Sequence, residues 1–453
     1  MELHICRALR GYTAPPAGRL HMPGHKGDGL RFPLCFSAPF DITELPFSDA
    51  LEDPCGVIAA AQEDIAAILG AGFVCILTDG SSSGVYAMVR AAGAKTLLLP
   101  RDAHKSAYNA CALLGVSPVI LENEAYEGAW LPPSPASVER ALRGHKGAAV
   151  LLTSPGYYGG VCDLAALRRI CDAHKAPLLI DGAHGAFMPF DAACAGSYAG
   201  RFADLWVDGS HKTMPTFTQG ALLCGRAAWR AAAEEAVQLF RTTSPSYPVM
   251  ASVEYGVKYM AEEGAALCAA VREDRAAAEA LLKAAGIRCF PSRTLSLAAD
   301  LAPAGISPRA MADALAKEDI WCELEDGRYL LVYNSPLTPP GALLAFAKAV
   351  LAHAEGLRGE PFFPPLPAHG EAASGYLQAL SAPYELVPLA AAEGRVAARN
   401  AGVTPPCYPV VAAGERITAA AVRALAGGAH TFGVAGGRIA VIEEGYERNV
   451  HHI

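Results

Sequence analysis

A run of small polar residues near the start of the chain could bind a phosphate. The segment 78–84 reads Thr-Asp-Gly-Ser-Ser-Ser-Gly and lies between a predicted strand and a predicted helix. Small residues let the backbone approach an anion, the hydroxyls donate hydrogen bonds, and the helix N-terminus adds free N–H groups. A Gly/Ser turn that caps the helix explains the segment equally well when it is taken alone. The Gly-Lys-Ser/Thr of a Walker loop is absent.

An acid and a lysine follow at the ends of two further apolar runs. Asp181 closes the run 177–180, where a carboxylate buried without a cation would be costly. Lys212 lies among small residues after Asp208-Gly-Ser-His, and a desolvated lysine becomes an amine nucleophile suited to a Schiff base. Taken singly, a turn-capping carboxylate and a solvated turn lysine are the alternative interpretations.

In combination the three segments indicate pyridoxal phosphate (PLP) chemistry. The lysine follows the acid by 31 residues, and both follow the anion-binding loop. The loop would bind the phosphate, Asp181 would pair with the protonated pyridine nitrogen, and Lys212 would form the Schiff base. The joint occurrence in this order is more specific than any one segment.

The elements that must position these residues follow an α/β pattern. Short apolar runs separated by helical segments are typical of a parallel sheet that is buried on both faces. Such open sheets bind ligands at the carboxyl ends of their strands. The predicted strands are 73–78, 96–100, 119–121, 148–153, 177–181 and 205–207, and the predicted helices are 85–92, 106–114, 137–143 and 164–174.

The second half of the chain differs from the first in composition and in its predicted secondary structure. Residues 257–285 are rich in Ala, Glu and Arg and predict a long connecting helix. Strands at 296–299 and 329–333 around a helix at 308–317 predict a smaller α+β unit, and the Pro-rich stretch 361–367 predicts a linker. The expected division is an N-terminal segment 1–40, a PLP-binding large domain 41–256, a connecting helix with a small domain 257–360, and a C-terminal domain 371–453.

Composition excludes several classes of protein. The 453 residues include 37 Lys or Arg and 45 Asp or Glu, which gives a net charge of −8 and argues against a nucleic-acid partner. No apolar run reaches the ~18 residues of a membrane span, and the first ten residues lack a signal-peptide pattern. Thirteen cysteines without a Cys-x-x-Cys pair predict reduced thiols. His21/His25 and His451-His452 lack supporting metal ligands. We therefore expect a cytoplasmic enzyme without a metal.

The motifs resemble those of the Orn/Lys/Arg decarboxylases, a family of fold-type I PLP-dependent enzymes, in the compact form without a wing domain. The resemblance runs over nearly the whole chain. It is carried by residues 21–27, 41–45, 80–84 with Ala87-Met88, 101–106, 153–159, 181–185, 210–213 with 218–220, 244–247, 405–409 and Gly414-Glu415.

The resemblance implies an aspartate aminotransferase-like large domain with a mainly parallel seven-stranded sheet, plus smaller α+β domains. It also implies the roles of the site residues. Lys212 holds PLP, Asp181 keeps the ring nitrogen protonated, and His104 stacks on the ring. His184 lies near the ring hydroxyl and His211 near the Schiff base. The phosphate ligands are Ser81, Ser82 and Ser210. A loop with Ser244, Ser246 and Tyr247 reaches a neighbouring subunit's site, which implies a homodimer or higher homo-oligomer with shared active sites.

Two departures from the family pattern and several alternatives accompany this interpretation. Gly182 stands where Glu is common, and Gly209 where Ser is common, with a serine one residue later.

The implied activity is decarboxylation of lysine, arginine or ornithine to an amine for polyamine biosynthesis. Candidate partners for the substrate's cationic tail are Glu44, Asp49, Glu52 and Asp53, although a solvated acidic turn explains them too. The alternatives are an aminotransferase or aldolase-like lyase, with Arg293 or Arg328 binding the α-carboxylate, and a PLP-binding scaffold without turnover.

Overall fold

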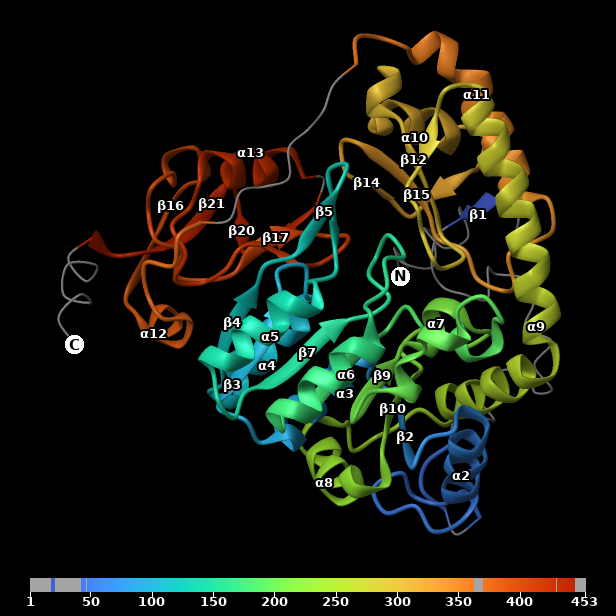
Figure 1. Cartoon of the computed structure of the whole chain (residues 1–453), viewed down its shortest axis with the longest axis vertical. Coiled ribbons are helices and arrows are strands. Elements are labelled where there is room, and N and C mark those ends of the chain that lie inside the picture. The colour runs from blue at the N-terminus through green and yellow to red at the C-terminus, as the bar shows by residue number, and fades with distance from the viewer. Residues whose placement is uncertain (1–17, 21–41, 46, 362–369, 429, 445–453) are drawn as a thin grey trace, which may run out of the picture.

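A seven-stranded sheet forms the centre of the protein. In the computed structural model, which describes residues 18–20, 42–45, 47–361, 370–428 and 430–444, the strand order is β2-β10-β9-β8-β7-β3-β4 (Figure 1). All neighbours pair in parallel except β10, which is antiparallel to β2 and β9. The predicted α/β fold with a mainly parallel seven-stranded sheet is therefore confirmed. The strands are β2 (Phe73–Leu77), β3 (Thr96–Pro100), β4 (Ser117–Leu121), β7 (Ala149–Thr153), β8 (Leu178–Gly182), β9 (Leu205–Asp208) and β10 (Ala221–Gly225).

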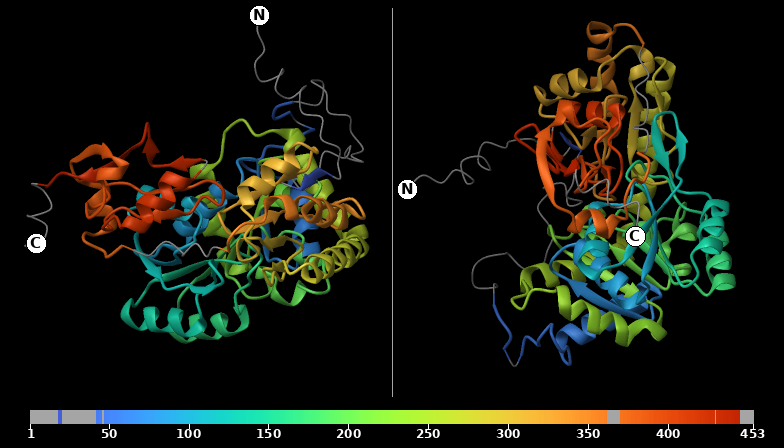
Figure 2. Two further views of the ribbon diagram at one scale, coloured as in Figure 1. Left: turned by 90° about the horizontal axis from the view of Figure 1, so that it is seen from above. Right: turned by 90° about the vertical axis from the view of Figure 1, so that its left-hand side faces the viewer.

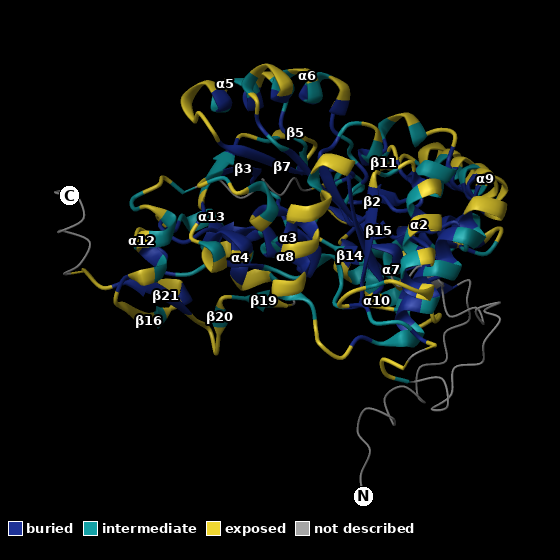
Figure 3. Ribbon diagram, turned by 90° about the horizontal axis from the view of Figure 1, so that it is seen from below, coloured by how far each residue is buried: buried dark blue, intermediate teal, exposed yellow. Residues whose placement is uncertain are grey.

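Helices cover both faces of this sheet, because alternate side chains of each strand point to opposite faces. Leu178 and Ile180 of β8 belong to one apolar cluster and Leu179 to the other. The first face is packed by α2 (Val57–Leu69), α5 (Pro135–Gly144) and α6 (Leu164–His174), and the second by α3 (Ser81–Ala92), α4 (Lys105–Leu114) and α8 (Arg230–Phe240). Figure 3 shows the buried strands between helices whose outer faces are exposed.

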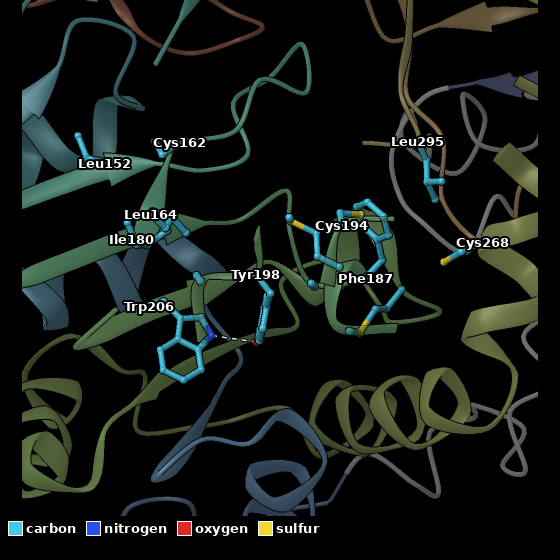
Figure 4. Packing of buried hydrophobic residues seen from close by; sticks show 14 of the residues in the cluster. Leu152, Cys162, Leu164, Ile180, Phe187, Cys194, Tyr198, Trp206, Cys268 and Leu295 are labelled. Carbon is cyan, nitrogen blue, oxygen red and sulfur yellow. Dashed lines mark hydrogen bonds between the residues drawn. The ribbon is translucent and has the colours of Figure 1, made fainter. Parts of the chain in front are cut away.

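The first face includes the largest fully buried side chain, Trp206 of β9. Its indole nitrogen donates a hydrogen bond of 2.9 Å to the hydroxyl of Tyr198, as the dashed line in Figure 4 shows. Leu152 and Ile180 project from the neighbouring strands into the same cluster (Figure 4). This packing leaves the strand ends as the part of the sheet that is open to a ligand.

A long helix, α9 (Tyr247–Ala284), leads to a second, smaller sheet. It begins ten residues before the predicted start, because Ser246 caps it by accepting a hydrogen bond from the N–H of Val249. The small sheet has the order β11-β12-β15-β14, with β11 (Arg288–Cys289), β12 (Leu297–Asp300), β15 (Tyr329–Val332) and β14 (Leu324–Glu325). The helices α10 (Pro308–Ala316) and α11 (Ala342–Leu357) complete this unit, and α11 packs along α9 (Figure 1). A short parallel pair joins β1 (Arg19–Leu20) to β13 (Trp321–Cys322).

Residues 370–444 form a further unit, which we call the C-terminal unit. It has two three-stranded sheets, β16-β21-β20 and β18-β17-β19, and its own apolar clusters. Figure 2 shows it on one side of the large sheet. Its elements are α12 (Tyr376–Ser381), β16 (Tyr384–Pro388), β17 (Ala401–Val403), β18 (Pro409–Val411), α13 (Ala419–Gly427), β19 (Thr431–Phe432), β20 (Val434–Ala435) and β21 (Arg438–Ile442).

Some sequence features lie outside the described residues. These are the motif at 21–27, Asp41, the paired histidines at 451–452 and nearly all of the predicted linker at 361–367. Among the helices that are described, none has the length and apolar character needed to cross a bilayer. Sequence analysis also missed β10 and the hairpin of β5 (Glu124–Tyr126) and β6 (Ala129–Leu131), which lies beside the site.

Candidate active site

A cavity of about 270 Å³ lies at the carboxyl ends of the sheet strands. Five strands supply its wall, because the segments that follow β2, β3, β7, β8 and β9 all line it. This position agrees with the expected ligand site of an open α/β sheet. The predicted site residues among its lining are Ser81, Ser82, His104, Asp181, His184, His211 and Lys212.

Lys212 lies in the short helix α7 (Ser210–Thr213), which directly follows β9. Its side chain lines the cavity, and its Nζ is 3.1 Å from Nε2 of His184. Burial lowers the pKa of the lysine below its ordinary value, while the nearby Asp181 carboxylate partly opposes this effect. A buried amine whose pKa is lowered is suited to nucleophilic attack on a carbonyl carbon.

Asp181 is the penultimate residue of β8, where its backbone pairs in register with Val207 of β9. The side chain is 4% exposed, and Oδ1 accepts a hydrogen bond of 3.1 Å from the N–H of Ala183. Burial raises the pKa of this carboxyl group, and the positive charge of Lys212 acts in the opposite direction. A carboxylate held at such a cavity wall is a suitable partner for a protonated ring nitrogen of a ligand.

The Gly/Ser loop forms the start of helix α3. Gly80 adopts φ 77°, a left-handed conformation that glycine allows without strain, and the helix begins directly at Ser81. Ser81 and Ser82 therefore occupy the first turn, where backbone N–H groups have no partner within the helix. The helix predicted at 85–92 therefore begins four residues earlier in the structure, at serines whose helix propensity is low. The structure brings this turn to the cavity, as an anion-binding site requires.

The hydroxyl of Ser210 is a further candidate ligand for a phosphate. Ser210 is fully buried and does not line the cavity, and its Oγ has no hydrogen-bond partner among the described residues. A buried hydroxyl without a partner costs free energy, and a ligand phosphate oxygen would satisfy it. The turn at Ser81 and Ser82, the acid and the lysine all line the cavity and therefore fit PLP in this chain, whereas Ser210 lies behind the lining.

Three histidines surround the lysine. His104 caps helix α4 by accepting a hydrogen bond of 3.2 Å from the N–H of Ser106. The Nδ1 of His184 lies 2.6 Å from the hydroxyl of Tyr333, and that of His211 lies 3.0 Å from the carbonyl oxygen of Gly220.

These histidines are held in the neutral form. Burial, and next the charge of Lys212, lowers the pKa of His104 to about 3 and that of His211 to about 4. The same causes lower the pKa of His184 well below its ordinary value. At neutral pH the imidazoles therefore add no positive charge to the cavity.

The two glycine departures lie side by side. Gly182 is in register with Asp208 on β9, and a Cβ at Gly182 would lie 2.9 Å from the carbonyl oxygen of Val207. A Cβ at Gly209 would lie 2.5 Å from the carbonyl oxygen of Ala183. The backbones after β8 and β9 thus approach so closely that neither position has room for a side chain.

Other predicted residues lie elsewhere in this chain. Ser244 is exposed, Ser246 caps α9, and the hydroxyl of Tyr247 donates a hydrogen bond of 2.6 Å to the carbonyl oxygen of Asp49. None of the three lines the cavity of its own chain. The prediction that this loop reaches a neighbouring subunit stays a prediction.

The acids proposed for the substrate's cationic tail do not line the cavity either. The carboxylate of Asp49 accepts hydrogen bonds from backbone N–H groups of residues 50–59, which lowers its pKa and ties it to the start of α2. Glu52 pairs with Arg241 across 3.5 Å, and the exposed Glu44 accepts a hydrogen bond from Thr43. Asp53 is exposed.

Several lining residues had no role in the sequence analysis. Asp102, Tyr157 and Tyr408 lie in motifs that were recognised there, whereas no sequence signal pointed to Trp130 or Asp326. Tyr157 contacts His184 edge to face, with ring centroids 5.1 Å apart. Tyr408 comes from the C-terminal unit, which therefore contributes to the cavity wall.

The fold and the site together define an α/β protein whose cavity is built around a buried lysine and a buried aspartate. The model of the Orn/Lys/Arg decarboxylase major domain matches residues 7–321, and that of the C-terminal domain of the same family matches residues 366–426. The chain belongs to the Orn/Lys/Arg decarboxylase family.

Individual relatives agree with this result. The uncharacterized protein YaaO of Bacillus subtilis is 27% identical over 94% of both chains. The arginine decarboxylase of the same organism is 26% identical over 92% of this chain and 91% of its own length. Among solved structures, lysine decarboxylase A from Pseudomonas aeruginosa superposes with a TM-score of 0.75 at 16% identity, covering 97% of this chain and 82% of its own. The lysine decarboxylase LdcF of Francisella novicida gives 0.73 at 18% identity, over 87% and 73%.

Proposed function

We propose that the protein is a PLP-dependent decarboxylase that converts a basic amino acid (lysine, arginine or ornithine) to the corresponding amine and CO2, for polyamine biosynthesis in the cytoplasm. The observation that carries this proposal is the buried Lys212, which shares one cavity with Asp181 and with the anion-binding turn at Ser81 and Ser82. Family membership supports the reaction class.

The proposed roles of the site residues concern the binding of PLP. Lys212 holds the cofactor covalently, and Asp181 keeps the ring nitrogen protonated. The phosphate is bound by Ser81, Ser82 and Ser210, while His104 packs on the ring and His184 lies near its hydroxyl. Bound PLP supplies a conjugated ring that accepts the electron pair of the broken bond.

The carboxylate leaves as CO2, and a proton must replace it at Cα. The Nζ of Lys212 is suited to deliver this proton because its pKa is lowered, so that the amine can both take up and release a proton. His211 is the alternative donor, although its Nδ1 is engaged by the carbonyl oxygen of Gly220.

The absence of an arginine from the described cavity lining favours decarboxylation over transamination. Arg328, one of the two candidates for binding the α-carboxylate, is bound to Asp300 at 2.8 Å and to Glu127 at 2.7 Å. Arg293, the other candidate, does not line the cavity. A substrate carboxylate without a cationic partner is poorly stabilised, which promotes its loss.

We also propose a homodimer or higher homo-oligomer with shared active sites. The exposed loop at Ser244 lies in a region with exposed apolar side chains, Leu45, Phe47 and Val57, and Phe47 is 71% exposed. The hydrogen bond from Tyr247 to Asp49 joins the loop to this region. Mixing inactive Lys212→Ala and Ser246→Ala proteins should restore activity if two chains share a site. Unchanged inactivity together with a monomeric sedimentation profile would contradict this part.

The central experiment incubates the purified protein and PLP with lysine, arginine and ornithine and measures CO2 and the matching amine. We expect turnover with at least one of them and none after Lys212→Ala. Full turnover in that variant would disprove the lysine's role. Consumption of 2-oxoglutarate would indicate an aminotransferase. A yellow PLP complex that forms no amine would indicate a scaffold.

A further inference from the structure

Two carboxylates, those of Asp102 and Asp326, line the cavity without a cationic partner in the described part of the chain. Asp102 follows β3, and Asp326 lies in the turn between β14 and β15. Four buried carboxylates pair with arginines: Asp191 with Arg272, Asp204 with Arg168, Asp300 with Arg328 and Glu415 with Arg101. Asp102, in contrast, is half-buried, and Asp326 is exposed. The contrast matters because a carboxylate that lines a cavity and has no protein cation beside it can bind a cationic ligand.

Both carboxylates accept hydrogen bonds from neutral donors. Asp326 accepts hydrogen bonds from the N–H of Arg328 at 2.9 Å and of Tyr329 at 2.7 Å, and from the hydroxyl of Tyr158. Asp102 accepts one of 2.6 Å from the side-chain amide of Asn123. These bonds orient the carboxylates without cancelling their charge.

Both acids line the same cavity as Tyr408. Burial raises the pKa of the Tyr408 hydroxyl, and the negative charges of Asp326 and Asp102 raise it further. Lys212 lines the same cavity, and its Nζ lies 3.1 Å from Nε2 of His184. One cavity therefore contains a buried amine and two carboxylates that have no cationic partner in the described part of the chain.

Asp208 is a further buried acid without an arginine partner among the described residues, and it serves as a comparison. Its Oδ2 accepts hydrogen bonds from Tyr198 at 2.6 Å and from Trp206 at 3.2 Å. Burial raises its pKa to about 7. Asp208 does not line the cavity, so the structure offers it no ligand.

We propose that Asp102 and Asp326 bind the distal cationic group of the substrate side chain and thereby select basic over neutral amino acids. This inference rests on the proposed function, which places the substrate's reacting end at Lys212. An ammonium or guanidinium group would make charge-assisted hydrogen bonds with the two carboxylates. The hydroxyls of Tyr158 and Tyr408 would flank it.

The test uses Asp102→Asn, Asp326→Asn and the double variant of the PLP-loaded protein. Asparagine keeps an acceptor oxygen for Asn123 and for the N–H of Tyr329, so the variants should fold, and a melting temperature that is not below that of the wild type checks this. KM and kcat are measured for arginine, lysine and ornithine, and for the neutral isosteres citrulline and 2-aminoheptanoate.

We expect each single variant to raise KM for the preferred basic substrate about tenfold or more, the usual effect of losing a hydrogen bond to a charged group. The value of kcat should change less, and the double variant should lose most of its preference for basic over neutral substrates. The matched control is Asp313→Asn, which removes an exposed carboxylate 3.5 Å from Arg309 and should leave KM unchanged.

Calorimetric titration of agmatine and cadaverine, compared with hexylamine, separates recognition of the cation from turnover. If the wild type decarboxylates a basic amino acid but the double variant keeps the same KM and the same discrimination, this inference is wrong and the proposed function stands. If no basic amino acid is decarboxylated but agmatine or cadaverine binds in a way that depends on both aspartates, the proposed function is wrong and the inference stands.

Discussion

Arg101 at the end of β3 forms a bidentate ion pair with Glu415 of the C-terminal unit, and both residues are buried. Nη2 of the arginine is 2.8 Å from Oε2 of the glutamate and 2.6 Å from the carbonyl oxygen of Val410. Oε2 also accepts a hydrogen bond of 2.8 Å from the N–H of Ala412. Because Arg101 directly precedes the cavity-lining segment, this pair joins the C-terminal unit to the site.

Breaking this pair should loosen the C-terminal unit. Glu415→Gln leaves the Arg101 guanidinium buried without a counter-charge, which typically costs about 3 kcal/mol. Urea unfolding should show this loss, and hydrogen exchange should localise it to residues 370–444. The exposed pair between Glu139 and Arg143 provides the control, since Glu139→Gln should cost at most about 0.5 kcal/mol. Equal effects of the two substitutions would contradict the role of the buried pair.

Asp181→Asn should lower kcat about a hundredfold to a thousandfold, the range seen when one preorganised charge-stabilising group is removed from an active site. The amide has nearly the same size but cannot stabilise a protonated ring nitrogen. Initial rates at saturating PLP measure the effect, and a PLP titration separates it from weaker cofactor binding. A kcat within threefold of the wild type would exclude this role for Asp181.

Gly209→Ser should destabilise the protein by about 1–3 kcal/mol, because the new Cβ would lie 2.5 Å from the carbonyl oxygen of Ala183 and the backbone must shift. Gly196→Ser is the matched control, since a Cβ there meets nothing within 4 Å. Thermal melting compares the two variants. If Gly209→Ser were as stable as the control and bound PLP more tightly, a serine at this position would be an accommodated phosphate ligand.

The carboxylates of Asp102 and Asp326 in the cavity lining should make substrate binding depend on pH. Burial raises the pKa of Asp102 to about 6, so its carboxylate becomes neutral below that pH. KM for the basic substrate should therefore rise as the pH falls through about 6, and Asp102→Asn should remove this rise. A variant that keeps the wild-type pH profile would show that another group titrates.

The raised pKa of Asp102 also predicts how the free energy of unfolding depends on pH. The folded protein holds the Asp102 proton up to about pH 6, whereas the unfolded chain releases it near the ordinary value of 3.8. Stability from this group is thus present at low pH and is lost as the pH rises through 6. At pH 7, Asp102→Asn should raise the free energy of unfolding by about 1 kcal/mol while it weakens substrate binding. A loss of stability would indicate a structural role instead.

Local patterns predicted most of the central sheet. The strand 96–100 and the helices at 164–174 and 308–317 agree with β3, α6 and α10 to within one residue, because buried strands and amphipathic helices have strong apolar signatures. β10 was missed, although its residues form a short, fully buried apolar run like those of the predicted strands. The domain boundaries at residues 40, 256 and 360 stay predictions.

The sequence by itself predicted that Lys212, Asp181 and the Gly/Ser turn would lie together, because each lies at the end of a strand and parallel strands end at one edge of a sheet, and all three line the cavity. Only the tertiary structure decided what faces them. Asp102, Asp326 and Tyr408 come from three distant segments, and the acids of residues 44–53 do not line the cavity. Some carboxylates pair with an arginine and others line the cavity. The packing between units decides this, and no local sequence pattern encodes it.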